Sequence, residues 1–161
     1  MEIRNLMTPS GLQALKDEIN QLKNVERPKV AADVNWAAGN GDLSENGDYI
    51  YGKQRLAEID FRVHALMKSI ESAVVIDPAA QTNREQIFFG ATVTYDSERS
   101  GERTITIVGV DEVLCDKSYV SWRAPVAIAL MKAQVGDVVK VNTPSGIDRL
   151  EVVEIAYPAG A

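Results

Sequence analysis

The chain has few of the residues that build metal centres and disulfides. Its 161 residues include one cysteine, Cys115, and one histidine, His64. A single cysteine cannot form an internal disulfide, and this pair cannot supply the ligands of a zinc site. We interpret Cys115 as an incidental buried or turn thiol and His64 as a residue on a helix flank.

Long apolar segments are also missing. No apolar run approaches the roughly 18 residues of a membrane-spanning helix, and the first five residues, Met-Glu-Ile-Arg-Asn, do not begin a signal-peptide core. We therefore expect a cytoplasmic protein without membrane contact.

Acidic residues outnumber basic residues in both halves of the chain. The formal net charge is −6, and residues 1–77 carry 9 Lys/Arg and 12 Asp/Glu while residues 78–161 carry 8 and 11. Neither half is a basic nucleic-acid-binding module by bulk charge. Any contact with nucleic acid must be local or made alongside a partner.

The first half of the chain has two stretches with helical spacing of apolar residues. Thr8 and Pro9 predict the start of the first helix, and Pro28 predicts a kink in it. Gly39-Asn40-Gly41 predicts its end, and Ser44 predicts the start of a second helix. Each stretch has a narrow coiled-coil seam. The seam residues are Leu12, Leu15, Ile19 and Leu22, then Leu56, Ile59, Val63, Leu66 and Ile70. Together the stretches predict an antiparallel helical hairpin with arms of roughly 30 residues and about 45 Å.

The second half changes to an alternating pattern after a linker at residues 78–86. The predicted strands are residues 87–95, 103–110, 118–122, 138–142 and 150–157, with a short apolar helix over 125–132. This order of predicted helices and strands indicates an α+β protein. We expect a hairpin domain to occupy residues 1–77 and a small, mostly antiparallel β domain with one short helix to occupy residues 78–161.

Two carboxylates lie in the predicted hairpin turn, in the segment Gly41-Asp42-Leu43-Ser44-Glu45-Asn46-Gly47-Asp48-Tyr49. Asp42 and Glu45 are three residues apart, so they converge on one side if the turn enters a helix. Magnesium binds in proteins through one or two carboxylates together with water and phosphate. Acids are also common at helix starts for structural reasons alone, and the spacing leaves both interpretations open.

This segment resembles the tip signature of the bacterial Gre factors (GreA/GreB), which stimulate transcript cleavage by RNA polymerase. The likeness extends over nearly the whole chain and is of the GreB type. The supporting motifs are Glu26-Arg27-Pro28, Trp36-Ala37-Ala38, RLAEID at 55–60, FFGA at 88–91, VGVDE at 108–112 and VNTPSG at 141–146. The resemblance implies a coiled-coil hairpin followed by an FKBP-like domain. It also implies that the domain docks outside the polymerase secondary channel and that the hairpin enters the channel.

The resemblance assigns roles to several hairpin residues. It implies that Asp42 and Glu45 act in cleavage and bind Mg²⁺ shared with the polymerase, so that the isolated protein needs no cofactor. It implies that Lys53, Arg55 and Arg62 contact the 3′ end of the nascent RNA. Salt bridges along the coiled coil are an equal alternative for these basic residues.

The resemblance also identifies a polymerase-docking loop at Ser121, Arg123, Ala124 and Pro125, where this sequence departs from the family. The family usually has an acid and a serine before the proline and an arginine in the following helix. Here Arg123, Ala124 and Ile128 occupy those positions. The reversed charge at Arg123 predicts an altered encounter rate and partner choice.

The favoured function is that of a monomeric accessory factor that stimulates cleavage by the polymerase and is not itself an enzyme. One alternative is a regulator that occupies the channel without stimulating cleavage. Others are a peptidyl-prolyl isomerase-like protein, although fold does not carry function, and a structural coiled-coil dimeriser. Trp36 and Tyr51 are predicted to pack within the hairpin, and the role of Tyr49 is open.

Overall fold

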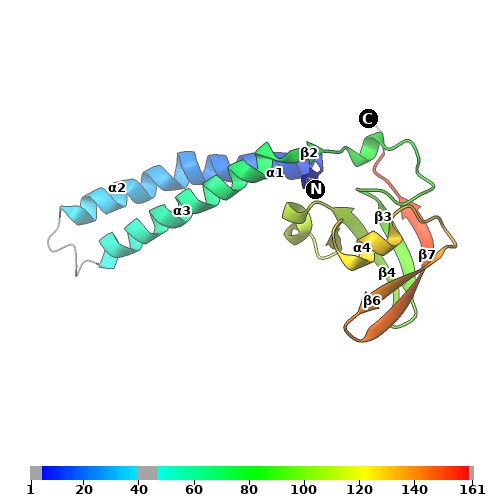
Figure 1. Cartoon of the computed structure of the whole chain (residues 1–161). Helices are drawn as coiled ribbons and strands as arrows, with labels where there is room; N and C mark the ends of the chain where they lie inside the picture. The colour runs from blue at the N-terminus through cyan, green and yellow to red at the C-terminus, as the bar shows by residue number, and fades with distance from the viewer. Residues whose placement is uncertain (1–4, 40–46, 160–161) are drawn as a thin grey trace. The chain divides into compact units, whose positions relative to one another are not determined.

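The computed structural model describes residues 5–39 and 47–159. Two compact units account for the chain (Figure 1): residues 12–73, and residues up to Gly11 together with those from Val74 onward. The two kinds of architecture, helical and then β-rich, confirm the predicted α+β class. The boundaries of the two predicted domains, 1–77 and 78–161, stay a prediction.

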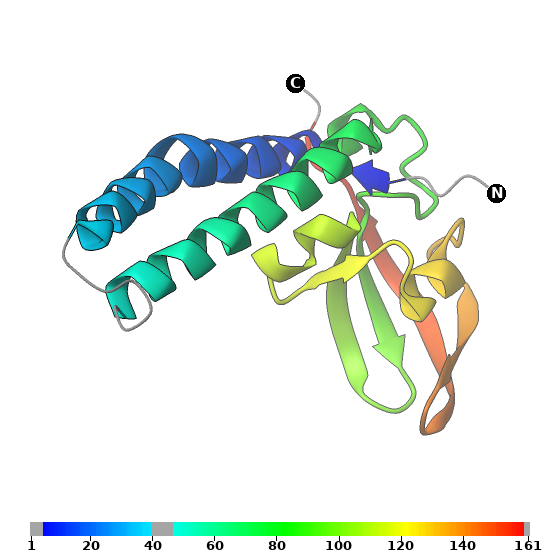
Figure 2. The same cartoon turned by 60° about the vertical axis from the view of Figure 1, so that its left-hand side comes forward.

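The helical unit is built from α1 (Pro9–Asn20), a π-helical turn η1 (Gln21–Glu26), α2 (Arg27–Ala38) and the long α3 (Gly47–Glu71). Figures 1 and 2 both show α2 and α3 side by side. All nine predicted seam residues are buried or half-buried. The 25 residues of α3 correspond to about 37 Å of helix, somewhat shorter than the predicted arm.

The predicted irregularity near Pro28 falls just before the proline. Proline lacks an amide donor, and its ring clashes with the carbonyl four residues earlier, which belongs to Asn24. That residue lies in η1, where the wider π-helical turn replaces regular α-helix, and regular helix resumes at Arg27.

The two arms approach closely at Gly52. This residue is buried in α3, and a Cβ atom placed on it would clash with Cγ2 of Val34 in α2 and touch Cγ1 of Val30. Val34 is 8% exposed, and its β-branched side chain has one strongly preferred rotamer in a helix. The neighbour therefore cannot easily move aside.

We expect Gly52→Ala to destabilise the hairpin by about 1–2 kcal/mol, because overpacking outweighs the gain of about 1 kcal/mol that alanine brings to a helix interior. The measurement is urea unfolding followed by circular dichroism at 222 nm. Adding Val34→Ala should lessen the effect of the glycine change. If Gly52→Ala instead stabilises the protein, the clash is relieved without cost.

A two-stranded sheet, which the sequence did not predict, forms from β1 (Asn5–Met7) and β2 (Ala73–Val75). Just beyond it, the Ile76 amide donates a hydrogen bond to the Met7 carbonyl at 2.9 Å. Each strand has only three residues, which is too short for a periodic pattern to indicate a strand.

The main sheet has five strands in the order β5-β4-β3-β7-β6. Their bounds are β3 Thr92–Ser97, β4 Gly101–Val108, β5 Tyr119–Ser121, β6 Val138–Thr143 and β7 Gly146–Ala156. The neighbours pair antiparallel except β4 and β5, which are parallel. A parallel pair needs a crossover connection, and this one contains an unpredicted 3₁₀ helix, η3 (Val110–Cys115).

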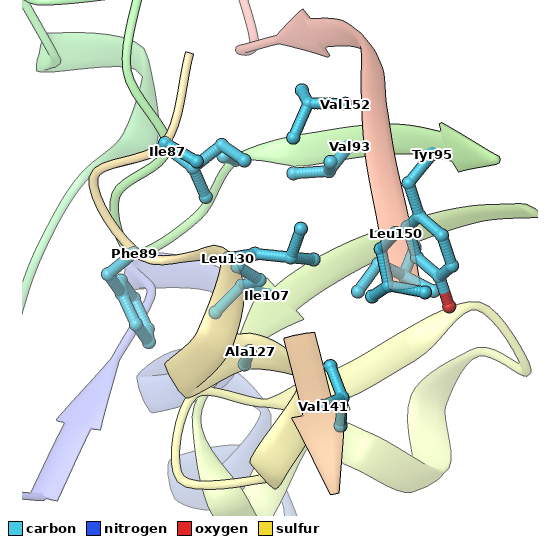
Figure 3. Close-up of a cluster of buried hydrophobic side chains, with 13 residues drawn as sticks. Ile87, Phe89, Val93, Tyr95, Ile107, Ala127, Leu130, Val141, Leu150 and Val152 are labelled. Carbon is cyan, nitrogen blue, oxygen red and sulfur yellow. The ribbon is translucent and has the colours of Figure 1, made fainter. Parts of the chain in front are cut away.

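The core of this unit lies between the sheet and the short helix α4 (Pro125–Leu130), which contributes Ala127 and Leu130 (Figure 3). Every second residue from 87 to 95 is buried, as the alternating pattern predicts. The prediction of one strand over 87–95 is nevertheless wrong, because β3 begins only at Thr92. Gly90 has φ +88°, a conformation that interrupts an extended strand.

Shorter corrections concern the ends of elements. The predicted helix over 125–132 stops at Leu130, and Lys132 has φ 68°. The last strand begins four residues earlier than predicted, at Gly146, directly after the turn. A second 3₁₀ helix, η2 (Pro78–Ala80), opens the predicted linker and is capped by the Asp77 side chain.

Candidate functional site

Asp42 and Glu45 lie outside the described residues, between the end of α2 and the start of α3 in the sequence. Asp48, the third acid of the same segment, is exposed in the first turn of α3. Among the described ranges 5–39 and 47–159, no group of three or more His, Cys, Asp or Glu side chains is arranged to hold a metal ion.

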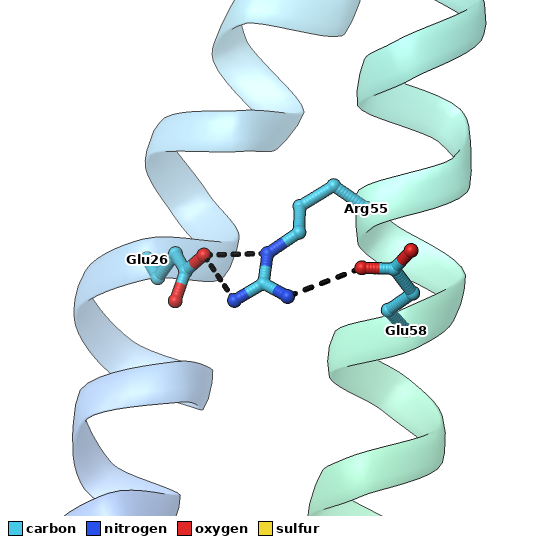
Figure 4. A network of polar contacts seen from close by, with 3 residues as sticks. All are labelled: Glu26, Arg55 and Glu58. Atoms are coloured by element: carbon cyan, nitrogen blue, oxygen red, sulfur yellow. Dashed lines mark hydrogen bonds and ion pairs between the residues drawn. The ribbon is translucent and has the colours of Figure 1, made fainter.

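Arg55 bridges the two arms (Figure 4). Its Nε and Nη2 atoms lie 2.7 Å and 2.6 Å from Oε1 of Glu26 in η1. Its Nη1 lies 3.2 Å from Oε2 of Glu58, three residues along α3. The hydrogen bonds that Arg55 donates to these carboxylates, first to Glu26 and then to Glu58, raise the pKa of Arg55 and hold the guanidinium in a defined direction.

Two further arginines form bidentate pairs across the arms. Arg62 donates from Nε and Nη2 to the Glu18 carboxylate at 2.6 Å and 3.1 Å. Arg27 donates to Asp60 at 2.8 Å and 3.3 Å. The Arg62 hydrogen bond lowers the pKa of Glu18 and the Arg27 hydrogen bond lowers the pKa of Asp60, while partial burial opposes both shifts.

We expect Glu18→Gln to weaken the hairpin by about 0.5 kcal/mol at neutral pH, the usual size for a partly exposed pair. A carboxyl with a lowered folded-state pKa stabilises the protein above its unfolded pKa of about 4.3. That contribution is lost as pH falls through the folded pKa. Urea midpoints of variant and wild type should therefore differ at pH 7 and converge as the pH falls below the lowered folded-state pKa of Glu18.

The matched control is Asp17→Asn, which changes an exposed acid on the same helix that accepts a hydrogen bond from Gln13 within α1. Equal stability of wild type and Glu18→Gln at neutral pH would show that the Arg62 pair contributes nothing measurable.

These pairs give Arg55 and Arg62 a structural role that sequence reasoning had kept as an alternative. Lys53, the third predicted RNA contact, is exposed on α3. Contact of all three with RNA stays a prediction. For the two arginines, it would require a phosphate to compete with carboxylates already in place.

The predicted docking residues form one continuous turn between β5 and α4. The Arg123 amide donates a hydrogen bond to Ser121 Oγ at 3.1 Å, and the Ala124 amide donates one to the Ser121 carbonyl at 2.9 Å. Ala124 has extended backbone and caps α4, and Pro125 is its first residue, a position suited to proline. Arg123 and Pro125 are exposed, so both side chains face solvent.

Beside this turn lies a hollow of about 380 Å³ lined by Trp122, Arg123, Ile128 and Met131. Ile128 is 63% exposed. The family position that usually holds an arginine is thus an apolar surface here. Polymerase docking through this turn stays a prediction.

A buried carboxylate that sequence reasoning missed is Glu112, which is 5% exposed. It accepts hydrogen bonds from the Thr8 amide at 3.3 Å, from the Thr8 hydroxyl, and from the Gly109 amide at 2.8 Å. Thr8 Oγ1 in turn accepts the Gly11 amide at 3.1 Å. Glu112 therefore holds Thr8, the residue just before α1. Glu112 lies three residues after Gly109, but glycine has no side chain to complete a capping box, so the sequence carries no clear signal for this contact.

Two aromatic predictions are wrong. Trp36 and Tyr51, expected to pack within the hairpin, are 70% and 71% exposed. Trp36 follows Val34 by two residues, which is about 200° around a helix, so burial of Val34 directs Trp36 away. Tyr49 is half-buried, while His64 and Cys115 are exposed.

The sequence comparisons assign this two-unit architecture to a family. A family profile described as the N-terminal part of a transcription elongation factor matches residues 5–75. One described as the C-terminal part of the transcription elongation factor GreA/GreB matches residues 81–157. The chain belongs to the GreA/GreB family of transcription elongation factors.

Two named GreB relatives agree with this assignment. Transcription elongation factor GreB from Neisseria meningitidis serogroup B is 50% identical over 156 residues, covering 97% of this chain and 96% of its own. GreB from Yersinia pestis is 43% identical, with coverages of 95% and 89%. Among solved structures, Gfh1 of Thermus thermophilus is 23% identical at a TM-score of 0.43, covering 96% of this chain and 99% of its own.

In the part of the chain that the structure describes, no helix has both the length and the apolar character required to cross a bilayer.

Proposed function

We propose that this chain binds RNA polymerase as a monomer in the cytoplasm and stimulates cleavage of the RNA 3′ end in backtracked complexes. The globular unit docks at the rim of the secondary channel through the turn at Ser121 to Pro125. The hairpin enters the channel and delivers Asp42 and Glu45 to the polymerase active site. The bond-breaking site belongs to the polymerase, so the chain itself is not an enzyme.

The observation that carries this proposal is the position of the two acids. They fall in the sequence between two helices that lie side by side, in a chain whose GreB relatives match it almost end to end. The long α3, held to the first arm by three arginine–carboxylate pairs, provides a defined support for groups that must act at a distance.

The donor set suits magnesium shared with a partner. Mg²⁺ binds through one or two carboxylates plus phosphates and water, and Asp42 and Glu45 are the residues that would share it with polymerase ligands. When bound, the ion supplies a Lewis acid for phosphodiester hydrolysis. The contribution of this chain is to add negative oxygen ligands and to orient a water molecule that donates hydrogen bonds to its carboxylates.

The deciding experiment is incubation with a backtracked complex of the cognate polymerase, followed by sizing of the RNA. Shortened RNA and a released 3′ fragment support the proposal. Binding without shortening would favour the regulator that occupies the channel without stimulating cleavage, an alternative suggested by the altered docking turn. Absence of binding would exclude both.

We expect Arg123→Asp to weaken binding to the cognate polymerase about fivefold at low salt, because a rim charge acts mainly through the association rate. The same change should improve binding to a polymerase that normally takes Gre factors with an acid at this position. Both effects should shrink at high ionic strength, where exposed charges are screened. The measurement is association kinetics over a salt series.

Cleavage at saturating Arg123→Asp should change little because the acids are untouched. Arg149→Asp, which reverses another exposed arginine of the same unit, is the matched control. Equal affinities of wild type and Arg123→Asp for both polymerases across the salt series would show that Arg123 has no bearing on partner choice.

A further inference from the structure

A hollow of about 330 Å³ lies between α2 and α3 near their adjoining ends. We call it the aromatic–acidic hollow. It is lined by Val30, Asp33, Trp36, Asp48, Tyr51 and Gly52. Trp36 is the third-last residue of α2, and Tyr51 is the fifth residue of α3. Neither the seam nor the tip acids account for this site.

The two walls of the hollow have the same composition. On α2, Asp33 precedes Trp36 by three residues, and on α3, Asp48 precedes Tyr51 by three. Residues at this spacing are neighbours on a helix surface. Each wall therefore presents one carboxylate beside one aromatic ring.

The floor of the hollow is closely packed. Gly52 is buried, and Val34 already fills the space that a Cβ atom on it would need, so the two arms meet closely here. Trp36 and Tyr51 stay 70% and 71% exposed. Two large rings left open to water at one place favour an external ligand over a role in packing.

The charge of the region selects the ligand. The residues that line the hollow include two acids, Asp33 and Asp48, and no lysine or arginine. This excess repels phosphate and attracts a cation. An arginine guanidinium stacks on aromatic faces and donates bidentate hydrogen bonds to carboxylates, and it does both better than the compact ammonium of lysine.

We propose that the aromatic–acidic hollow binds an arginine side chain of the RNA polymerase, an inference that rests on the proposed function. The guanidinium lies against Trp36 and Tyr51 and donates to the Asp33 and Asp48 carboxylates. This contact anchors the hairpin where α2 ends and α3 begins, independently of the docking turn. It adds affinity from the arm that carries the acids.

The first test uses the full chain without polymerase. Trp122→Phe leaves Trp36 as the only tryptophan, so its indole N–H signal in NMR reports on the hollow alone. Titration with N-acetyl-arginine amide should shift this signal saturably at millimolar concentration, and Asp33→Asn should weaken the response. N-acetyl-citrulline amide, which has a similar planar end without charge, should give no response.

Two results of this titration would overturn the proposal. One is the absence of any saturable shift with the arginine compound. The other is a shift with guanosine or cytidine 5′-monophosphate in its place, which would make the hollow a site for an RNA base.

The second test uses polymerase. Trp36→Ala and Tyr51→Ala should each lower the affinity of the full chain about five- to tenfold, as loss of a partly desolvated cation–π contact implies. Phe61→Ala is the matched control, because Phe61 is also on α3, is 79% exposed and does not line the hollow. Its affinity should stay within about twofold of wild type.

The outcomes separate the two proposals. If wild type binds polymerase and stimulates cleavage while the Trp36 and Tyr51 variants bind polymerase equally well, the arginine contact is overturned and the proposed function stands. If wild type neither binds polymerase nor stimulates cleavage, the proposed function is overturned, and the polymerase is no longer the partner of the hollow.

Discussion

Asp42→Asn and Glu45→Gln are each expected to reduce stimulated RNA cleavage on the order of a hundredfold while leaving polymerase binding nearly unchanged. Removing one preorganised electrostatic contact to a developing charge has an effect of this size. Each amide keeps the shape of the side chain but loses the charge that a shared magnesium ion requires. The measurement is the cleavage rate at saturating factor, paired with the affinity for the same backtracked complex.

Glu71→Gln, a neutralised exposed acid in the last turn of α3, is the control for a general effect of charge. Calorimetry of the isolated protein should show only weak Mg²⁺ binding, because two carboxylates make an incomplete site. If both tip variants stimulated cleavage at the wild-type rate, the metal-sharing role would be refuted. Tight stoichiometric Mg²⁺ binding without polymerase would refute the shared site.

The second large effect is expected at Glu112, in the β-rich unit. Glu112→Ala should destabilise the globular unit by about 2–4 kcal/mol, because it leaves the buried amides of Thr8 and Gly109 without an acceptor. Glu112→Gln should cost less, about 1 kcal/mol. One amide oxygen remains as acceptor, and the Thr8 hydroxyl is able to rotate and accept a hydrogen bond from the new NH₂ group.

Trp122 fluorescence in a Trp36→Phe background reports on this unit during urea unfolding, since Trp122 packs against its core. Asp111→Ala is the matched control, because Asp111 is the exposed acid next to Glu112 in η3. A loss of stability as large for Asp111→Ala as for Glu112→Ala would show that the buried hydrogen bonds are not the cause.

Periodic features of the hairpin and sheet could be predicted because they depend on local spacing. The seam of apolar residues three and four apart identified both arms, and burial at every second position from Ile87 to Tyr95 follows from alternation. The family motifs then supplied the class of protein. They also supplied the candidate acids Asp42 and Glu45, which lie outside the described residues.

Features that depend on contacts between distant segments could not be predicted. The pairing of β1 with β2 joins residues nearly 70 positions apart, and the parallel pairing of β5 with β4 depends on a crossover. Arg55 and Arg62 carried an equal expectation of RNA contact or salt bridging, and only the positions of Glu26 and Glu18 on the facing arm show the carboxylates they meet.

By itself, the sequence determined the α+β class, the two helical arms with their seams and the family to which the chain belongs, because these follow from short-range periodicity and motif identity. Only the tertiary structure decided that Glu112 holds Thr8 and that Trp36 and Tyr51 face water beside Gly52. The physical reason is that hydrogen bonding and exposure depend on which surfaces of distant segments meet, and one-dimensional spacing does not specify that meeting.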